Sequence, residues 1–236
     1  MSAAVEDPQN STWAAYRGRL QDYFDRTALE AWAQLTSDAP VSKVRATVRA
    51  GRDEMRSLLL SWLPSDLTGL RVLDAGCGTG ALAVEAARRG ANVVAIDVSA
   101  SLIDIARERA PNDLAGSIDW QAGDMMQPEL GEFDHVVAMD SLIHYPTREI
   151  EDVVAALSYR TRGSMVFTVT PRTPALMLML MAGKLFPRAD RAPAIAPADI
   201  DILARRLSGL QGRQLTRTRR VSAGFYTSQA LELVRR

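Results

Sequence analysis

Hydrophobic residues recur with two different periods along this chain, and the change between the periods divides it into two parts. In residues 12–36 and 43–62 the apolar side chains return every three or four positions, as in amphipathic helices. From Leu70 onward, short and nearly continuous apolar runs alternate with helical stretches. These runs cover residues 70–75, 92–96, 117–121, 133–139 and 164–170. The pattern predicts strands buried on both faces, as in a parallel sheet covered by helices.

The rest of the chain completes this prediction. Helices are expected between the strands, then an apolar helix within residues 174–187, a helix over residues 197–208 and two last strands within residues 212–234. The predicted fold class is therefore α/β. It is a doubly wound, Rossmann-like, mainly parallel seven-stranded sheet with an N-terminal helical extension and a helical insert after the fifth strand. We expect a helical cap over residues 1–64 and one larger domain over residues 65–236, with the apolar insert at about residues 172–197.

Charge and cysteine content narrow the function classes. Twenty-eight basic residues balance 28 acidic ones, so the zero net charge argues against a dedicated nucleic-acid-binding protein. From Arg205 to the C-terminus, however, eight arginines stand against one acid, Glu232, which gives a net charge of +7. This basic segment suits anionic lipids or an acidic partner, and a solvated strand face explains it equally well. The single cysteine, Cys77, excludes an internal disulfide and is typical of a cytoplasmic protein.

The most informative segment joins a predicted strand to a predicted helix through Gly76, Gly78 and Gly80. Such a turn lets a ligand approach the backbone beside the free N–H groups of a helix N-terminus. Acidic residues stand at or after three strands, namely Asp74, Asp97 and Asp124. The spacing from Gly76 to Asp97 also fits dinucleotide binding. Asp74 would repel a pyrophosphate and attract a sulfonium or ammonium, which favours a cofactor with a cationic centre, a ribose and an adenine but no phosphates.

This combination resembles the class I S-adenosylmethionine-dependent methyltransferases over about residues 65–236. The resemblance implies S-adenosylmethionine as cofactor and S-adenosylhomocysteine as its product, with no metal site in the protein itself. It assigns cofactor binding to eight residues: Asp74, Gly76, Gly78, Gly80, Asp97, Val98, Asp124 and Met125. Asp74 then faces the methionine part, Asp97 binds the ribose hydroxyls, and Asp124 with Met125 meets the adenine.

Three segments outside this common core concern the methyl acceptor. The first is the N-terminal helix, whose aromatic residues either pack in the core or fold over the cofactor cleft. The second is His144-Tyr145-Pro146, which follows the fourth strand at the mouth of the cleft. The third is the Met-rich insert, which is apolar all round and so is typical of a buried helix, a membrane contact or the lid of an apolar pocket.

These segments resemble the magnesium-protoporphyrin IX methyltransferase family of chlorophyll and bacteriochlorophyll biosynthesis, over nearly the whole chain. The likeness rests on Tyr23-Phe24 with Trp32, Val41-Ser42-Lys43-Val44 before a helix with Arg49 and Gly51, Asp74–Gly80, His144-Tyr145-Pro146, and Gly224-Phe225-Tyr226. It implies methyl transfer from S-adenosylmethionine to a propionate carboxylate of Mg-protoporphyrin IX. Magnesium then enters only as part of the substrate.

The resemblance also implies roles for individual residues. Tyr23 and His144 are the expected catalytic residues: Tyr23 closes the site and orients the substrate, and His144 holds the propionate or the Mg-porphyrin. Substrate contacts are expected from Tyr16, Tyr145, Arg172 and Met177. Arg172 departs from the family pattern, because this chain has Thr170-Pro171-Arg172-Thr173 where relatives are expected to carry Ala-Pro-Lys-Thr. The implied partners are the porphyrin-carrying subunit of magnesium chelatase and the surface of the photosynthetic membrane.

Three alternatives remain open from the sequence. A methyltransferase of a quinone-like or other apolar small molecule would also use an apolar insert and a basic edge. A dinucleotide-dependent oxidoreductase fits the looser glycine pattern. A non-catalytic binding module could keep the same fold, but the intact set of Asp74, Asp97 and Asp124 argues against it.

Overall fold

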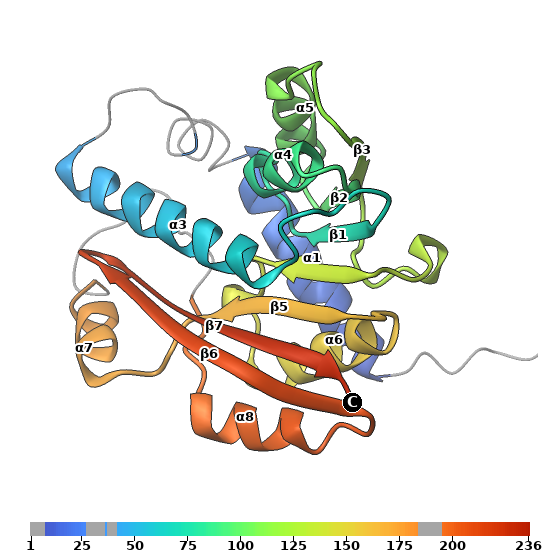
Figure 1. Ribbon diagram of the computed structural model, residues 1–236. Coiled ribbons are helices and arrows are strands. Elements are labelled where there is room, and N and C mark those ends of the chain that lie inside the picture. Colours follow the sequence, from blue (N-terminus) through green and yellow to red (C-terminus); the bar gives the residue numbers. More distant parts are fainter. Residues whose placement is uncertain (1–7, 27–35, 37–41, 184–194) are drawn as a thin grey trace, which may run out of the picture.

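The computed structural model describes residues 8–26, 36, 42–183 and 195–236, which form one sheet with helices on both faces (Figure 1). The strand order is β3-β2-β1-β4-β5-β7-β6. The strands are β1 (Arg71–Ala75), β2 (Asn92–Asp97), β3 (Ser117–Ala122), β4 (His135–Ala138), β5 (Ser164–Val169), β6 (Arg213–Ala223) and β7 (Tyr226–Arg235). The first five pair in parallel, and β7 runs antiparallel to both β5 and β6. The predicted fold class is confirmed.

The helices follow the predicted pattern closely. They are α1 (Pro8–Arg26), α3 (Lys43–Trp62), α4 (Ala81–Arg88), α5 (Ala100–Arg109), α6 (Thr147–Tyr159), α7 (Pro174–Gly183) and α8 (Ile200–Ser208), with short 3-10 turns η1 (Pro128–Leu130) and η2 (Leu142–His144). The fourth strand is shorter than expected, because the chain turns out of the ladder at Asp140, whose φ is 54°. Trp32, Val41 and residues 184–194 of the expected insert lie outside the described residues.

Successive side chains along each strand point to opposite faces of the sheet, and they form two apolar cores, one on each face. In β1, Leu73 packs with α6 and α8 on one face, whereas Val72 packs with α3 and α4 on the other. In β4, Val136 and Val137 divide in the same way. Both faces are covered, which explains why the strands are nearly continuous apolar runs in the sequence.

Helix α3 packs directly on the sheet and on the tip of the β6–β7 hairpin. Ser42 caps the start of the helix, its side chain accepting a hydrogen bond from the Arg45 N–H at 3.3 Å. Where α3 meets the hairpin there is no room for a side chain: a Cβ on Gly51 would lie 2.5 Å from the Tyr226 ring. Helix α3 therefore packs tightly against the hairpin of the larger domain, and the division of the chain at residue 64 stays a prediction.

Helices α1 and α3 lie on opposite sides of the sheet (Figure 1). Both belong to the expected N-terminal extension, yet each completes a different core: Trp13 and Leu20 join one, Met55 and Leu59 the other. Within the described part of the chain, every helix is too short or too polar to span a bilayer.

Removing a buried side chain of α3 tests this packing. Leu59 is fully buried, so Leu59→Ala should lower the free energy of unfolding by about 2–5 kcal/mol in urea or thermal denaturation. Ser57→Ala, at an exposed position of the same helix, is the matched control and should stay within about 0.5 kcal/mol of the wild type. Equal stability of the two variants would contradict the described position of α3.

Candidate active site

A cavity of about 250 Å³ lies at the carboxyl ends of β1, β2 and β4. This is the edge at which open parallel sheets bind their ligands. The glycine turn after β1 and the residues after β2 and β4 form its base, and α1 and α3 contribute its other walls. The lining residues used below are Leu20, Phe24, Arg52, Asp74, Gly76, Gly78, Asp97, Val98, Met125, Asp140, Ser141, His144 and Tyr145.

The glycine turn is fixed against β2 and leaves no room for side chains at two positions. The N–H groups of Gly76 and Cys77 both donate to the Ile96 carbonyl, at 2.8 and 3.0 Å. Gly76 has φ 83°, and a Cβ there would lie 2.3 Å from Cβ of Ser141. Gly80, with φ 81°, does not line the cavity; a Cβ there would lie 2.3 Å from the Trp120 ring. Gly80 therefore allows the start of α4 to pack against Trp120, whereas Gly76 allows the turn to lie close to Ser141 at the cavity.

Asp74 brings an uncompensated carboxylate to the cavity. Its side chain is buried, and its Oδ2 has no hydrogen-bond partner among the described residues. Burial, reinforced by the nearby charge of Asp97, raises the pKa of Asp74 to about 7. The Ser141 hydroxyl, which also lines the cavity, is likewise buried without a hydrogen-bond partner in the described structure. A bound ammonium or sulfonium would supply the missing partner and favour the ionised carboxylate, so Asp74 fits the methionine part of the expected cofactor.

Both carboxylate oxygens of Asp97 accept hydrogen bonds, unlike those of Asp74. Its Oδ2 accepts the Gly78 N–H at 2.9 Å, and its Oδ1 accepts the Ser99 N–H at 3.0 Å. Burial raises the pKa of Asp97, and these backbone donors act in the opposite direction. A carboxylate oxygen accepts more than one hydrogen bond, so a fixed Asp97 is well suited to receive two ribose hydroxyls.

Asp124 follows β3, and its expected contact with the adenine stays a prediction. It does not line the cavity; instead its Oδ2 accepts Trp13 Nε1–H at 2.9 Å and pairs with Arg17 Nη1 at 2.5 Å. Its Oδ1 accepts the Met126 N–H at 2.9 Å. Asp124 thus anchors α1, and the neighbouring Met125 reaches the cavity. The residues that hold Asp124 come more than 100 positions earlier, so strand-end spacing gave no sign of them.

Helix α1 closes one side of the cavity. Besides the contacts with Asp124, the Ser99 hydroxyl donates to Asp25 Oδ1 at 2.5 Å. The Trp13 ring stacks on Tyr145, with centroids 4.6 Å apart and 22° between the planes. Leu20 and Phe24, one turn apart, then face the cavity. The sequence left open whether the aromatic residues of this helix pack in the core or lie over the cleft, and Trp13, Arg17 and Asp25 had no signal beyond their helical spacing.

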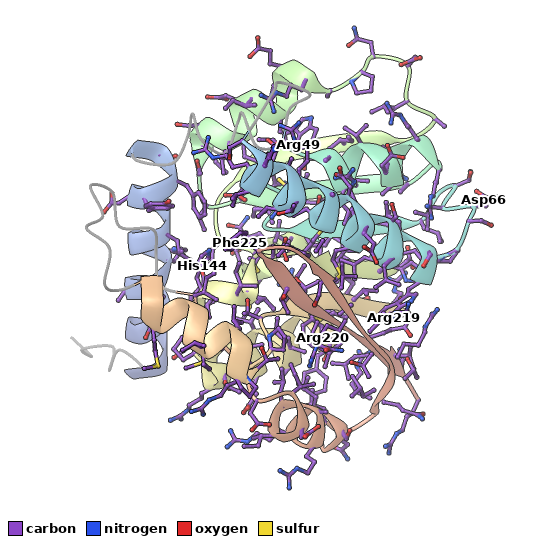
Figure 2. All side chains as sticks on the ribbon, turned by 90° about the vertical axis from the view of Figure 1, so that its left-hand side faces the viewer. Arg49, Asp66, His144, Arg219, Arg220 and Phe225 are labelled. Carbon is purple, nitrogen blue, oxygen red and sulfur yellow. The ribbon has the colours of Figure 1, made fainter. Side chains whose placement is uncertain are left out.

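A second, more apolar cavity of about 300 Å³ adjoins the first. Its walls include Tyr23, Val48, Ile143, Leu176, Ile195 and Phe225. Four residues line both cavities: Phe24, Arg52, Asp140 and His144. Figure 2 shows His144 near α1 and Phe225 at the tip of the β6–β7 hairpin. The shared residues mark the junction at which a group in one cavity can meet a group in the other.

The remaining expected site residues are dispersed. Tyr23 lines the apolar cavity and His144 the junction, with the His144 ring edge-on to Phe24. Tyr145, expected to bind substrate, is buried behind Trp13 and lines the first cavity. Tyr16 packs on Tyr145, at 6.1 Å between ring centroids. Of the expected catalytic and substrate-binding residues, three line neither cavity: Tyr16, Arg172 and Met177.

Comparison with known proteins agrees with this geometry. Residues 138–235 match the family described as Magnesium-protoporphyrin IX methyltransferase C-terminus, and residues 72–162 match the general family described as Methyltransferase domain. Over 223 residues the chain is 53% identical to Magnesium-protoporphyrin O-methyltransferase of Rhodobacter capsulatus, covering 94% of this chain and 98% of the relative. The chain belongs to the magnesium-protoporphyrin methyltransferase family.

Another member of the magnesium-protoporphyrin methyltransferase family, from Synechocystis, is 33% identical over 223 residues, covering 92% of this chain and 95% of the relative. The crystal structure of magnesium protoporphyrin IX methyltransferase from Synechocystis with bound SAH superposes with a TM-score of 0.83 at 30% identity. The match covers 93% of this chain and all of that one. Membership in this family confirms the resemblance seen in the sequence and sets aside the oxidoreductase alternative.

The raised pKa of Asp74 predicts how the stability of the protein depends on pH. A carboxyl whose folded-state pKa is raised keeps its proton in the folded state between its ordinary pKa of 3.8 and about 7, where the unfolded chain releases it. The stability of the ligand-free protein therefore falls, through this group, as pH rises over that range. Asp74→Asn should raise the melting temperature at pH 8, and the gain should shrink toward pH 4 in thermal unfolding. The same variant should weaken S-adenosylhomocysteine binding by about tenfold or more in calorimetry, because a charged partner is lost.

Asp66→Asn is the control for this experiment. Asp66 is exposed and lies away from His144 at the far end of α3 (Figure 2). It should leave S-adenosylhomocysteine binding unchanged. Wild-type affinity in Asp74→Asn, or a stability gain independent of pH, would contradict the role given to the buried carboxylate.

Proposed function

We propose that this protein transfers the methyl group of S-adenosylmethionine to a propionate carboxylate of Mg-protoporphyrin IX, giving the monomethyl ester and S-adenosylhomocysteine. The observation that carries the proposal is the pair of adjoining cavities. One presents buried carboxylates to a cationic cofactor, and the other is apolar and large enough to receive part of a macrocycle. The relatives from Rhodobacter capsulatus and Synechocystis are magnesium-protoporphyrin O-methyltransferases, and the Synechocystis structure holds SAH, which supports the same function.

The cofactor supplies the methyl group and a sulfur leaving group. Asp74 and the Ser141 hydroxyl would hold its methionine part, and Asp97 its ribose. Val98 and Met125 line the same cavity and would flank the adenine. Gly76 and Gly78 let the backbone approach closely, whereas Gly80 and Asp124 contribute indirectly, through the packing of α4 and α1.

The acceptor requires orientation rather than a strong base. A propionate has a pKa of about 4–5 by analogy with Glu and is already ionised at neutral pH. Holding oxygen, methyl carbon and sulfur in line therefore provides most of the catalysis, and positioning of this kind can supply several kcal/mol. We assign His144 at the junction to holding the carboxylate, and Tyr23 in the apolar cavity to orienting the ring system. Leu20 and Phe24 of α1 exclude water from the meeting point.

A methyl-transfer assay tests the proposed function. Purified protein with S-adenosylmethionine and Mg-protoporphyrin IX should form the monomethyl ester, and metal-free protoporphyrin should react more slowly. His144→Asn should retain part of the turnover, because an orienting side chain can be replaced by another hydrogen-bonding one, whereas Phe in place of His144 should lose more. Complete loss with both substitutions would instead indicate an obligatory base.

The controls separate this function from its nearest rival. Arg107→Gln, at an exposed position of α5 outside both cavities, should keep wild-type turnover. Absence of any ester with the wild-type protein would refute the proposal, and methylation of a quinone-like phenol in the same assay would favour the alternative substrate class.

Two further contacts are proposed on narrower grounds. Ile195 and Phe225 line the second cavity and are exposed. Further exposed apolar side chains lie on the helices that line it: Val44 on α3, whose Val48 lines the cavity, and Leu178 and Met181 on α7, whose Leu176 does. They suit shallow contact of the protein with a membrane surface. The family resemblance adds the porphyrin-carrying subunit of magnesium chelatase as the donor of the substrate.

The basic C-terminal segment contributes less charge to such a surface than its sequence suggests. Arg217 pairs with the buried Glu232 at 2.6 Å, and its guanidinium lies 5.3 Å from the Trp62 ring centroid. Arg220 donates to Gln229 Oε1 at 3.0 Å. Arg219 is exposed on the same strand (Figure 2). Of these three arginines, Arg219 is the one whose side chain has no hydrogen-bond or ion-pair partner among the described residues.

Sedimentation with vesicles containing anionic lipid distinguishes the two contributions. Phe225→Ser should reduce vesicle binding more than Arg219→Gln, because the exposed ring buries apolar area in the membrane whereas one surface cation contributes only about 1 kcal/mol. Arg107→Gln should bind as the wild type does. Equal binding by all variants would contradict membrane contact at this rim.

A further inference from the structure

Asp140 occupies an unusual position between the two cavities. It follows β4, lines both cavities, and is the one non-glycine residue with positive φ in the described parts of the chain, at 54°. Strained backbone of this kind persists where surrounding contacts fix it, and it is concentrated at functional sites. The Asp140 N–H donates to Thr168 Oγ1 at 2.7 Å, which fixes the turn against β5.

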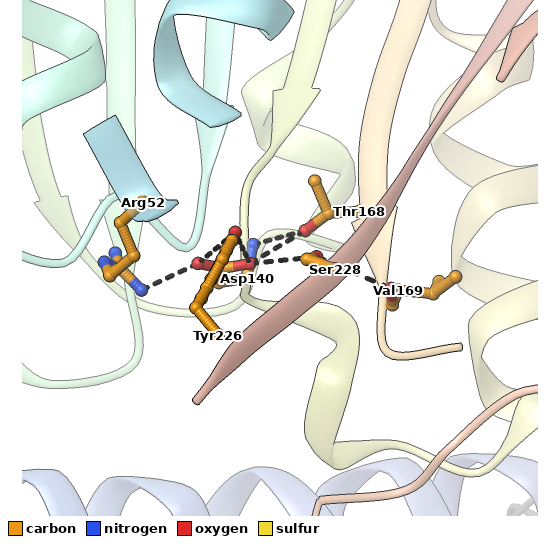
Figure 3. A network of polar contacts seen from close by, with 6 residues as sticks. All are labelled: Arg52, Asp140, Thr168, Val169, Tyr226 and Ser228. Atoms are coloured by element: carbon orange, nitrogen blue, oxygen red, sulfur yellow. Dashed lines mark hydrogen bonds and ion pairs between the residues drawn. The ribbon is translucent and has the colours of Figure 1, made fainter. Parts of the chain in front are cut away.

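The Asp140 carboxylate collects donors from three elements (Figure 3). Arg52 of α3 pairs with Oδ2 at 2.8 Å, and the two side chains are 19% and 3% exposed. The Tyr226 hydroxyl lies 3.1 and 3.2 Å from the two carboxylate oxygens. Thr168 and Ser228 donate to Oδ1 at 3.2 and 3.4 Å. The carboxylate is thus a fixed centre that holds the guanidinium of Arg52 in one place.

The backbone of α3 fits this arrangement closely. Gly51 precedes Arg52, and a Cβ on Gly51 would lie 2.9 Å from Cβ of Tyr226. Helix and hairpin are therefore in direct contact at the point where Arg52 and Tyr226 both reach Asp140. In the sequence, Gly51 and Tyr226 stand out only as parts of motifs, and Arg52 and Asp140 carry no signal of a role.

The pair formed by Arg52 and Asp140 lies at the junction of the two cavities, where the methyl group must be transferred. A methyl group can pass only where the sulfonium of one cavity meets the acceptor of the other, so the acceptor carboxylate must lie beside the shared residues. A carboxylate leaves water for an apolar cavity only when a cation or several donors compensate it. Arg52 is the arginine that lines both cavities, whereas Arg49 and Arg56 line the first alone and Arg172 lines neither.

We propose that Arg52 binds the methyl-accepting carboxylate of the substrate, and that Asp140 and Tyr226 act as positioning residues for its guanidinium. The inference rests on the proposed function and adds the residue that recognises the reacting group. A guanidinium presents a planar set of five N–H donors and can bridge two carboxylates. Hydrogen bonds from Tyr226, Thr168 and Ser228 spread the charge of Asp140, which limits its repulsion of the incoming carboxylate.

The reaction itself follows a simple balance. One carboxylate oxygen forms a bond to the methyl carbon while the carbon–sulfur bond breaks and its electron pair returns to sulfur. No proton is transferred. The ester formed is neutral and loses its ion pair with Arg52, so this site favours the acid over its own product.

Comparing Mg-protoporphyrin IX with its dimethyl ester isolates this recognition. Both probes fill the apolar cavity, but only the diacid carries free carboxylates. In absorbance titrations the wild-type protein should bind the diacid more tightly. In Arg52→Gln the preference should fall about tenfold or more, because a charge-assisted hydrogen bond is lost. Arg52→Lys should lose part of the preference, and Tyr226→Phe, which removes only the hydroxyl that positions the pair, a smaller part.

Controls distinguish recognition from folding and from the proposed function. Arg88→Gln, which breaks an exposed pair with Glu85, should keep the wild-type preference. The melting temperature and the S-adenosylhomocysteine affinity show whether each variant is folded. If Arg52→Gln does not fold, Arg52→Lys and Tyr226→Phe test whether the pair recognises the carboxylate. An unchanged diacid preference in folded Arg52 variants would overturn the inference while leaving ester formation intact. Absence of ester in the wild type would instead refute the proposed function, whatever the titrations show.

Discussion

The site depends on carboxylates that the fold removes from water at the ends of parallel strands. Asp74, Asp97 and Asp140 lie at or just after the carboxyl ends of β1, β2 and β4, and all three are buried. Burial penalises the charged form unless donors or cations compensate it. Asp97 receives two backbone N–H groups and Asp140 receives Arg52 with three hydroxyls, whereas Asp74 keeps one oxygen without a partner in the described structure. The incomplete compensation of Asp74 leaves a place for a cation, and the other two carboxylates fix the geometry around it.

Helix α1, which covers one side of the first cavity, is attached to the sheet by a different set of contacts from those that hold α3. Leucines and methionines hold α3 to the sheet, whereas α1 combines the buried side chains of Trp13 and Leu20 with polar contacts of Trp13 and Arg17 to Asp124 and of Asp25 to Ser99. Partly exposed ion pairs contribute little each, typically under about 1 kcal/mol. Opening of α1 alone breaks these contacts and leaves the sheet intact, so it costs less than global unfolding. A cover attached in this way can admit both cofactor and substrate without disturbing the strand ends that bind them.

Much of the fold could be predicted from the sequence because the relevant physics is local. Strands buried on both faces must be apolar at successive positions, and a strand that turns sharply into a helix needs glycine, so both left clear patterns. Asp140 and Arg52 left none, since an acid after a strand and an arginine on an amphipathic helix are ordinary at those positions. The proposed role of Arg52 and Asp140 depends on the packing of α3 on the β6–β7 hairpin, which brings Arg52 and Tyr226 into contact with Asp140. The same limit explains Asp124, whose spacing suggested an adenine contact and whose partners lie on α1.

The contrast between the two cavities also bears on the reaction rate. A sulfonium and a carboxylate react to give a thioether and an ester, so one positive and one negative charge disappear together. Charge is already partly lost in the transition state, and surroundings of low polarity therefore favour it over the separated ions. The walls of the second cavity are largely apolar, and the Arg52–Asp140 pair beside the junction adds no net charge. Such a pair can orient the acceptor through hydrogen bonds without stabilising its ionised form as strongly as a lone cation would. Orientation and a neutral environment are thus compatible here because the cation that recognises the acid is balanced by a fixed carboxylate.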